Sequence, residues 1–438
     1  MEKYIAVIQA GGMGTRMLEL TKNEVPKPLF PLDGRPMMQW QIELLKTYNI
    51  TEIIIIIGYL GDKIKEYFKD GKAFGVNIRY IEEKEPLGSA GALYYLKSMI
   101  SCKKILLIFG DVMFNMDINR MIRFHEEKQA QITLLVHPNS HPNDSDVLRI
   151  DEQKRVIGIL PKKEKRKDWY DNCTNAGIYI LEEDVLKKIK EPKKIDLEKE
   201  LILPLITTNT VYGYHTTEYI KDAGTVSRFF SVERAHKNGI WDKKNLKNKQ
   251  RCIFLDRDGT VNVYKGLVSC EELFELEEGV ATAIRLLNEE GYLVIVVTNQ
   301  PVVARGMCDI DDVKRIHRKM QVLLGEQGAY VDDIVFCPHH PDKGYPEENP
   351  EYKIICDCRK PATGMIDEMV KKYNIDIKNS YIIGDSTIDI ELGRRVGLKT
   401  ILVKTGLAGK DAKFNIEADL VTEKLKEAVL KIIQTEKN

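Results

Sequence analysis

The sequence predicts two α/β domains, each built around a mostly parallel sheet. Short apolar runs rich in β-branched residues alternate with amphipathic stretches along both halves of the chain, which is typical of βα units. A Lys/Asn-rich stretch separates the two series, and at 438 residues the chain is longer than one average domain. We therefore expect a first domain at 1–236, a linker at 237–249 and a second domain at 250–438.

The predicted strands of each half follow one another in a regular order. In the first half they are 4–9, 52–59, 104–111 and 175–181, with amphipathic stretches such as 37–48 between them. In the second half they lie within 251–260, 292–300, 332–338, 381–386 and 399–406, with helical stretches such as 280–290. No internal repeat relates the halves, so we expect a fusion of two different domains.

Composition excludes several classes of protein. Lys+Arg and Asp+Glu both number 66, so overall charge gives no attraction to nucleic acid or to a membrane surface. Apolar runs such as Ile53–Ile57 are too short to span a bilayer, and the N-terminus lacks the pattern of a signal peptide. We expect a cytoplasmic protein whose partners are small molecules. In that compartment clustered cysteines indicate metal or redox chemistry before disulfides.

A glycine-rich loop follows the first predicted strand. Gly11, Gly12 and Gly14 let the backbone approach an anion and present N–H groups to it, and Arg16 adds a fixed charge. Lys27 follows between two prolines that stiffen its loop, which suits a lysine held against phosphate. A glycine-rich turn that binds nothing is the alternative for the loop taken alone.

A series of motifs in the first half resembles the sugar-1-phosphate nucleotidyltransferases. They are Gly-Gly-x-Gly-Thr-Arg from Gly11, Pro-Lys-Pro around Lys27, EPLGSAGAL at 85–93, FGD at 109–111, NAGIYI at 175–180 and YIKDAGT at 219–225. Their shared order over residues 1–235 is far more specific than any one of them. The resemblance implies a Rossmann-like domain that joins a nucleoside triphosphate to a sugar 1-phosphate.

The resemblance also assigns roles in this first site. It implies that Gly11, Gly12, Gly14 and the loop amides hold the nucleotide, that Arg16 and Lys27 hold phosphates, and that Gly88 borders the base. Asp111 and Asp222 would hold Mg²⁺, while Asn175 and Gly177 would contact the sugar. Such residues suit a reaction in which the enzyme aligns two polyanions and offsets their charge. Relatives have Glu-Lys where this chain has LPKKEK, so Lys162, Lys163 and Lys165 all stay open as contacts for the sugar phosphate.

The second half carries acidic and basic residues at the ends of its predicted strands. Asp256 and Asp258 end the first of these strands, Thr298 ends the next, and Asp385 ends a later one; Lys360 lies between the last two. Because ligands of open α/β folds bind at the carboxyl edge of the sheet, we expect these side chains to meet there.

These motifs resemble the haloacid-dehalogenase phosphatases over residues 251–405. The resemblance implies that Asp256 attacks phosphorus and that Asp258 protonates the leaving oxygen and then activates water. It implies Mg²⁺ on Asp256, Asp258 and Asp385, with Thr298, Asn299, Arg359 and Lys360 on the substrate. Asp389 would support this site or cap the next helix. The distance in sequence between Thr298 and Lys360 leaves no room for a large cap domain.

Two closely spaced pairs of soft ligands lie in the loop at 335–361. Cys337-x-His339 and Cys356-x-Cys358 supply the four N/S donors that a closed tetrahedral zinc site requires. Such a site would be structural and would hold a long loop that has no core of its own. A cluster of unliganded thiols is the alternative, and His340 is the alternative ligand to His339.

The two halves together point to one pathway. Within its superfamily the second half most resembles the D-glycero-D-manno-heptose 1,7-bisphosphate phosphatases and the related histidinol phosphatases. Removal of the 7-phosphate yields a heptose 1-phosphate, the kind of substrate that the first half consumes. We expect a bifunctional enzyme of nucleotide-heptose synthesis. The first half most resembles the mannose- and heptose-1-phosphate guanylyltransferases, which implies GTP as the donor and leaves ATP, CTP and dTTP as alternatives. Alternatives are a mannose-1-phosphate guanylyltransferase fused to another phosphatase, and a regulatory protein in which one domain has lost catalysis.

Overall fold

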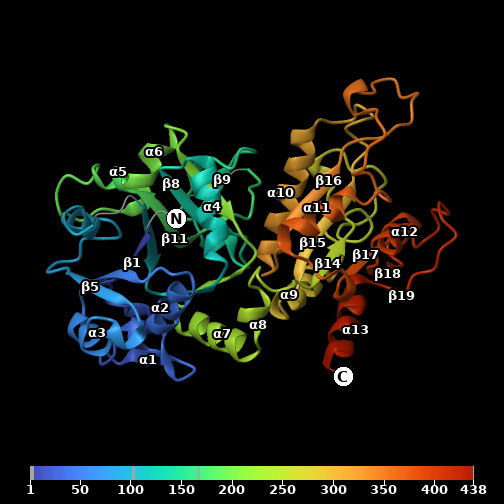
Figure 1. Ribbon diagram of the computed structural model, residues 1–438. Helices are drawn as coiled ribbons and strands as arrows, with labels where there is room; N and C mark the ends of the chain where they lie inside the picture. Colours follow the sequence, from blue (N-terminus) through green and yellow to red (C-terminus); the bar gives the residue numbers. More distant parts are fainter. Residues whose placement is uncertain (1–3, 101–103, 165, 167, 438) are drawn as a thin grey trace. The chain divides into compact units, whose positions relative to one another are not determined.

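The computed structural model describes residues 4–100, 104–164, 166 and 168–437. The chain divides into two compact units (Figure 1). The first comprises Met1–His137, Leu148–Leu160 and Asn175–Asn245, and the second comprises Pro138–Val147, Pro161–Thr174 and Leu246–Asn438. Both are mixed α/β structures, as predicted.

The first unit is built on a mixed sheet of the order β10-β9-β11-β6-β1-β4-β5, from which β8 and β12 branch at β11. The strands of this sheet are β1 Tyr4–Ala10, β4 Glu52–Ile57, β5 Asn77–Glu82, β6 Lys104–Phe109, β8 Ile132–His137, β9 Val147–Ile150, β10 Val156–Leu160, β11 Thr174–Glu182 and β12 Val211–His215. The helices are α1 Leu18–Thr21, α2 Met37–Thr47, α3 Gly61–Phe68, α4 Ile118–Lys128, α5 Glu183–Leu186, α6 Leu203–Ile206, α7 Val226–Lys237 and α8 Ile240–Lys243. β1 pairs in parallel with both β4 and β6, so the chain enters the sheet at its centre.

Two short strand pairs complete the first unit. β7, Val112–Asn115, pairs with β13, Tyr219–Asp222, while β2, Pro31–Leu32, pairs with β3, Arg35–Pro36. Apart from Gln9 and Glu52, β1 and β4 are apolar, as expected of strands covered on both faces.

The stretch predicted as a linker contains helix α8. Ile240 and Trp241 of this helix are buried and pack with Tyr219 and Phe229 in one apolar cluster. The division between the two units falls after Asn245. The average composition of 237–249 is polar, but two large apolar side chains suffice to anchor a single helical turn to a core.

The second unit is a parallel six-stranded sheet of the order β16-β15-β14-β17-β18-β19. Its strands are β14 Cys252–Leu255, β15 Leu293–Asn299, β16 Asp333–Cys337, β17 Tyr381–Gly384, β18 Lys399–Val403 and β19 Leu420–Thr422. Its helices are α9 Val280–Glu289, α10 Ile310–Glu326, α11 Gly364–Tyr373, α12 Thr387–Val396 and α13 Leu425–Lys437.

Alternate residues of β14 show how the sheet of the second unit is covered. Ile253 and Leu255 pack with apolar residues of α9, α10 and α13, whereas Cys252 and Phe254 pack with residues of α11 and α12. Side chains of a strand point alternately to the two faces, so helices cover the sheet on both sides. β14 has β15 on one side and β17 on the other, which places a topological switch point at its carboxyl end.

Candidate functional site

The glycine-rich loop forms one wall of a cavity in the first unit. The loop leaves β1 at Ala10, and Gly14 has a φ of 61°, a conformation that favours glycine. The cavity has a volume of about 430 Å³. Seven residues predicted for this site line it: Gly11, Gly12, Gly14, Arg16, Lys27, Gly88 and Asp111.

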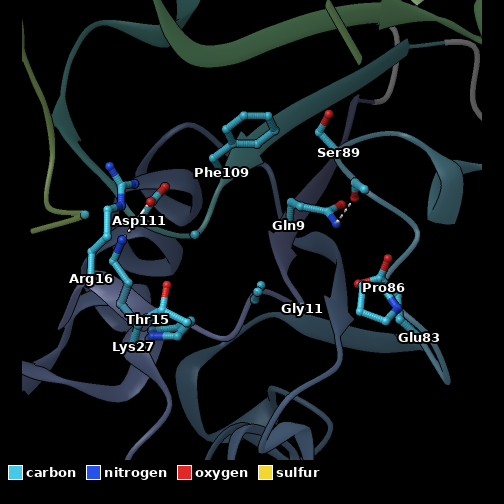
Figure 2. A pocket seen from close by; sticks show the side chains of 17 residues that line it. Gln9, Gly11, Thr15, Arg16, Lys27, Glu83, Pro86, Ser89, Phe109 and Asp111 are labelled. Carbon is cyan, nitrogen blue, oxygen red and sulfur yellow. Dashed lines mark hydrogen bonds and ion pairs between the residues drawn. The ribbon is translucent and has the colours of Figure 1, made fainter. Parts of the chain in front are cut away.

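The cavity has two chemically different ends. Figure 2 shows Arg16, Lys27 and Asp111 together at one side and Glu83, Pro86 and Ser89 at the other, with Gly11 between them. Lys27 Nζ lies 2.7 Å from Asp111 Oδ2, and its side chain is largely buried. The first end can therefore hold anionic groups with its two cations and a hard metal ion with its carboxylate.

Asp222 is brought to the neighbourhood of Asp111 by strand pairing. Residue 222 of β13 lies opposite Val112 of β7, and the Ala223 N–H donates to the Asp111 carbonyl over 2.8 Å. The Asp222 carboxylate accepts hydrogen bonds from Gly224 N and from Arg228 Nη1. Asp222 is not among the residues that line the cavity, so its predicted role as a metal ligand stays a prediction.

Asn175 and Gly177 lie on β11. Asn175 Nδ2 donates to Glu198 Oε1 and to the Tyr179 hydroxyl, while its Oδ1 accepts from Gly177 N over 3.1 Å. Neither residue lines the cavity described above. Sequence patterns did not single out Glu198. It lies three residues after Ile195, which forms a parallel bridge with Gly88 of the cavity wall.

Glu83 is the residue of this site that the motifs missed. It follows the end of β5, and its Oε2 lies 2.0 Å from the position that a Cβ on Gly11 would take. A glycine at position 11 is therefore needed for the carboxylate to lie against the loop. Partial burial raises the pKa of Glu83, although the Leu87 N–H donates to its Oε1 over 3.3 Å.

In the basic segment after β10, Lys162 and Arg166 contact residues of the segment 142–146. Lys162 Nζ lies 3.5 Å from Asp144 Oδ1, so this lysine has a carboxylate partner. Lys165 lies outside the described residues. Which lysine of this segment contacts a sugar phosphate therefore stays open.

In the second unit, Asp256 lies at the carboxyl end of β14 beside a buried lysine. Lys360 Nζ donates to Asp256 Oδ1 over 2.6 Å, to Asp389 Oδ1 over 2.6 Å and to the Val297 carbonyl over 2.9 Å. Asp385, at the end of β17, has a carboxylate oxygen within 4.8 Å of those of Asp256 and Asp389. The strand-end placement predicted from the sequence thus brings the predicted nucleophile, a cation and further carboxylates together.

Burial dominates the electrostatics of this cluster. It raises the pKa of Asp256 to about 7 and that of Asp385 to about 8, because each carboxylate has little access to water and faces another. Burial opposes the charge of Lys360, but Asp256 and Asp389 outweigh it and raise the pKa of the ammonium group. Closely spaced carboxylates with raised pKa values fit a divalent cation, which would replace the protons.

The other residues predicted for this site surround the cluster. Thr298, at the end of β15, is buried, and Asn299 exchanges two hydrogen bonds with the Lys360 backbone, of 3.0 and 3.1 Å. Ser386 is the N-cap of α12, and Asp389 completes the capping box by accepting from Ser386 N over 3.3 Å. The bond from Lys360 to Asp389 also fits the other predicted role, support of the site. The group of neighbouring carboxylates contains Asp389 and not Asp258, whose carboxylate is held elsewhere.

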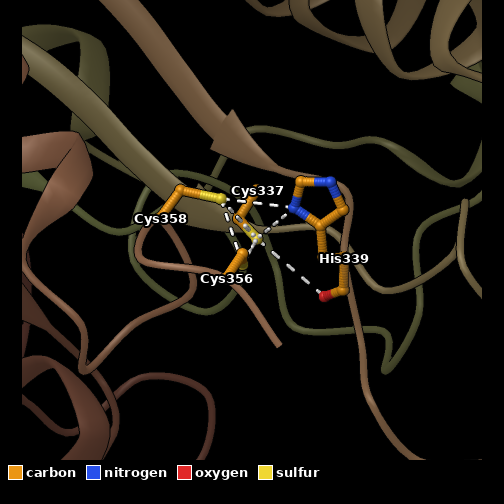
Figure 3. A group of neighbouring side chains, drawn as sticks. All are labelled: Cys337, His339, Cys356 and Cys358. Carbon is orange, nitrogen blue, oxygen red and sulfur yellow. Dashed lines mark hydrogen bonds between the residues drawn. The ribbon is translucent and has the colours of Figure 1, made fainter. Parts of the chain in front are cut away.

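The four predicted zinc ligands converge. The Sγ atoms of Cys337, Cys356 and Cys358 lie 3.2–3.5 Å apart, and His339 Nδ1 is 3.3 Å from Cys358 Sγ (Figure 3). Zn–S bonds of about 2.3 Å in a tetrahedron place sulfurs about 3.8 Å apart. The donors are therefore of the right kind and nearly the right spacing for Zn²⁺.

The same loop links the cluster to Lys360. His339 rather than His340 belongs to the cluster, and His340 Nδ1 instead accepts from the Asp342 N–H over 3.1 Å. Arg359 Nη1 donates to the His339 carbonyl over 3.0 Å, and Lys360 follows directly in the chain. A metal at the cluster would thus hold the segment that carries the active-site lysine.

Comparisons with known proteins match both halves of the chain. The nucleotidyl transferase family model matches residues 5–239, more than half of the chain, and a HAD-hydrolase-like family model matches residues 357–428. No helix among the described residues is long and apolar enough to cross a bilayer.

Individual relatives match one half each. A D-glycero-beta-D-manno-heptose-1,7-bisphosphate 7-phosphatase from Haemophilus ducreyi is 40% identical over 182 residues, which are 41% of this chain and 97% of that protein. A mannose-1-phosphate guanylyltransferase from Mycobacterium tuberculosis is 29% identical over 226 residues, which are 51% of this chain and 62% of that protein. The crystal structure of a D,D-heptose 1,7-bisphosphate phosphatase from B. bronchiseptica, complexed with magnesium and phosphate, is 32% identical with a TM-score of 0.38 and covers 42% of this chain and 99% of that one.

Proposed function

The chain belongs to the nucleotidyl transferase family and also to the family of D-glycero-D-manno-heptose-1,7-bisphosphate 7-phosphatases, and from this we propose that it is a bifunctional enzyme of nucleotide-heptose synthesis. The second unit removes the 7-phosphate of the bisphosphate. The first unit then joins the heptose 1-phosphate to a nucleotide and releases pyrophosphate. The observation that carries the proposal is that one chain holds a complete set of strand-end phosphatase residues and a separate nucleotide-sized cavity with two cations.

In the phosphatase reaction, Asp256 is the nucleophile. Its Oδ bonds to phosphorus while the bond from phosphorus to the sugar oxygen breaks, and a proton passes to that oxygen from Asp258. Lys360 orients Asp256 and would offset the charge of the phosphoryl group, and Thr298 would donate to a phosphoryl oxygen. Asp256 and Asp385 would hold Mg²⁺ with Asp389 nearby, and the ion would reduce the repulsion between carboxylate and phosphate dianion.

In the nucleotidyl transfer, the protein aligns two polyanions and supplies no nucleophile. Backbone N–H groups of Gly11 and Gly12 face the triphosphate, and Arg16 and Lys27 offset the charge that accumulates as pyrophosphate leaves. Asp111, with Asp222 close to it in the strand pair, would hold Mg²⁺ for the same purpose.

Glu83 favours guanine as the base. A carboxylate offers two acceptors and no donor, whereas the Watson–Crick edge of guanine presents two adjacent donors, N1–H and N2–H₂. Glu83 lines the end of the cavity away from Arg16 and Lys27, which is where a base would lie. The guanylyltransferase relative agrees with this choice.

A mannose-1-phosphate guanylyltransferase fused to a phosphatase with another target, such as one resembling the histidinol phosphatases, is the second candidate. The similarity of the first half to a mannose-1-phosphate guanylyltransferase is the observation that favours it. The two candidates differ in the sugar, which phosphate release from a panel of sugar phosphates and histidinol phosphate would decide.

We further propose that Zn²⁺ occupies the cluster of Cys337, His339, Cys356 and Cys358. All four ligands come from the protein, so the ion would have a structural role and would leave no open position for substrate.

The test of the proposed function follows the two products separately. The full-length protein should release one phosphate per heptose 1,7-bisphosphate and then release pyrophosphate when GTP is added. Asp256→Asn should abolish phosphate release and leave transfer from supplied heptose 1-phosphate within about threefold of wild type, because the variant leaves the first site intact. A folded wild-type protein that releases phosphate from histidinol phosphate and not from the heptose bisphosphate would refute the proposal.

A further inference from the structure

Arg257, between the two aspartates after β14, is the largest fully buried side chain among the described residues. Its exposure is 0%. A guanidinium removed from water must be paired with an anion and have its N–H donors satisfied, or the fold loses several kcal/mol. The partners of Arg257 therefore show what its charge is used for.

The guanidinium is bound to Asp258. Arg257 Nη2 donates to Asp258 Oδ1 and Oδ2, each over 2.9 Å, and Arg257 Nε donates to Oδ1 over 3.2 Å. Asn262 Nδ2 adds a donor 3.1 Å from the same Oδ1. Both oxygens of Asp258 are thus held by charged or amide donors.

Gln300 connects this pair to the phosphate-binding side of the site. Its Oε1 accepts from Arg257 Nη2 over 3.0 Å, while its Nε2 donates to Asp258 Oδ2 over 2.8 Å and to Thr298 Oγ1 over 2.9 Å. Gln300 is 1% exposed, so no water competes for these contacts.

His317 on α10 holds the guanidinium from the other side. Its Nε2 lies 3.3 Å from Arg257 Nη1, and because arginine has no acceptor, this nitrogen must carry a lone pair. Burial, together with the charge of Arg257, lowers the pKa of His317 well below its usual range, which agrees with a neutral ring. His317 does not contact Asp258, so it can influence that carboxylate only through Arg257.

We propose that Arg257 is a positioning residue that fixes the orientation of Asp258, with His317 as its support. The proposal rests on the proposed phosphatase function. In the second chemical step a water oxygen bonds to the phosphorus of the phosphorylated Asp256, the bond from phosphorus to Asp256 breaks, and the proton of the water passes to Asp258. That transfer requires a carboxylate oxygen at a fixed place, and Arg257 with Gln300 supplies the constraint.

The test separates the two chemical steps with two substrates. p-Nitrophenyl phosphate has a leaving group that needs no proton, so phosphorylation of Asp256 does not depend on Asp258, whereas hydrolysis of the intermediate does. In full-length Arg257→Lys, we expect a rapid release of about one p-nitrophenol per chain, followed by turnover on the order of 10²-fold slower than wild type. The phosphorylated protein should be recovered after an acid quench. With heptose 1,7-bisphosphate, kcat should fall by a similar factor and KM should stay within about threefold.

Arg251→Lys is the matched control, because Arg251 precedes the same strand and contacts the Glu290 carbonyl and the Tyr292 ring instead of Asp258. His317→Leu removes the support of Arg257 and should slow turnover of both substrates by roughly tenfold, while His317→Gln, which keeps an acceptor, should restore most of it. These variants also keep the test informative if Arg257→Lys does not fold.

Wild-type rates in Arg257→Lys, or an equal loss of the p-nitrophenol burst and of steady turnover in the folded variant, would overturn the proposal. Failure of the proposed function would look different, because the wild-type protein itself would then release no phosphate from heptose 1,7-bisphosphate.

Discussion

Replacing Glu83 with glutamine tests how the nucleotide base is selected. The Glu83 carboxylate is half-buried and contacts Gly11. It lies at the end of the cavity away from Arg16 and Lys27. Hydrogen bonds to a charged group contribute about 1.5–3 kcal/mol each. The amide of glutamine keeps one acceptor and turns a donor toward the guanine donors. We therefore expect Glu83→Gln to lose about 3 kcal/mol of transition-state stabilisation with GTP, which lowers kcat/KM on the order of 10²-fold.

The assay measures pyrophosphate release with heptose 1-phosphate and GTP, ITP or ATP. Inosine lacks the 2-amino group, so wild type should prefer GTP over ITP by about tenfold or more, and Glu83→Gln should bring that ratio near one. Adenine pairs a donor with an acceptor on the same edge, as an amide does, so ATP use should rise in the variant. Glu85→Gln, an exposed residue of the same loop, is the control for a lost charge.

An unchanged ratio of GTP to ITP in Glu83→Gln would refute the reasoning, because it would show that Glu83 does not contact the base. Equal use of all three nucleotides by wild type would refute the assignment of guanine itself.

Four further outcomes are expected. Wild type should retain about one Zn²⁺ per chain through dialysis, and Cys356→Ser should lose it and lower the melting temperature of the second unit alone, seen by metal analysis and calorimetry. Lys360→Met should abolish phosphate release and destabilise the same unit by about 3–5 kcal/mol in denaturant unfolding, because it leaves buried carboxylates without a cation. Burial lowers the pKa of His125 to about 4, so as pH falls the histidine binds a proton in the unfolded chain before it does so in the folded one. The free energy of unfolding of the first unit should therefore fall by about 3 kcal/mol between about pH 6.5 and pH 4. In His125→Gln this free energy should depend less on pH. Asp256→Asn given heptose 1,7-bisphosphate, GTP and Mg²⁺ should release negligible pyrophosphate, and adding the separate phosphatase domain should restore it.

Residues fixed by strand ends could be located from the sequence. Asp256, Thr298 and Asp385 each end a parallel strand, and parallel strands bring their carboxyl ends to one edge, so their meeting in the second unit follows from the pattern alone. The cluster of Cys337, His339, Cys356 and Cys358 could be predicted from chemistry, because a tetrahedral zinc site needs four N/S ligands close together and the loop supplies them as two closely spaced pairs.

Residues placed by loops or by side-chain direction could not be located in this way. Glu83 enters the nucleotide cavity because the turn after β5 passes Gly11, and no local pattern specifies that approach. Arg257 is a charged residue in a polar motif, and only the packed structure shows that its side chain is fully buried between Asp258 and His317. Helix α8 was missed because average composition hides two anchoring side chains in a polar segment.

Charge explains why the phosphatase reaction should come first. Arg16 and Lys27 are the cationic residues among those that line the nucleotide cavity, and Lys27 is already paired with Asp111. A nucleoside triphosphate and a sugar 1-phosphate bring more negative charge than these groups offset, so the site relies on backbone N–H groups and on metal to hold them. A second phosphate at C7 would add a dianion with no cation among the lining residues to receive it, so only the basic segment after β10 could supply the missing charge. Leaving the dianion unpaired or incompletely solvated costs binding energy. Removal of the 7-phosphate converts that end of the sugar to a neutral hydroxyl, which makes the product of the second unit a better substrate for the first than the bisphosphate itself.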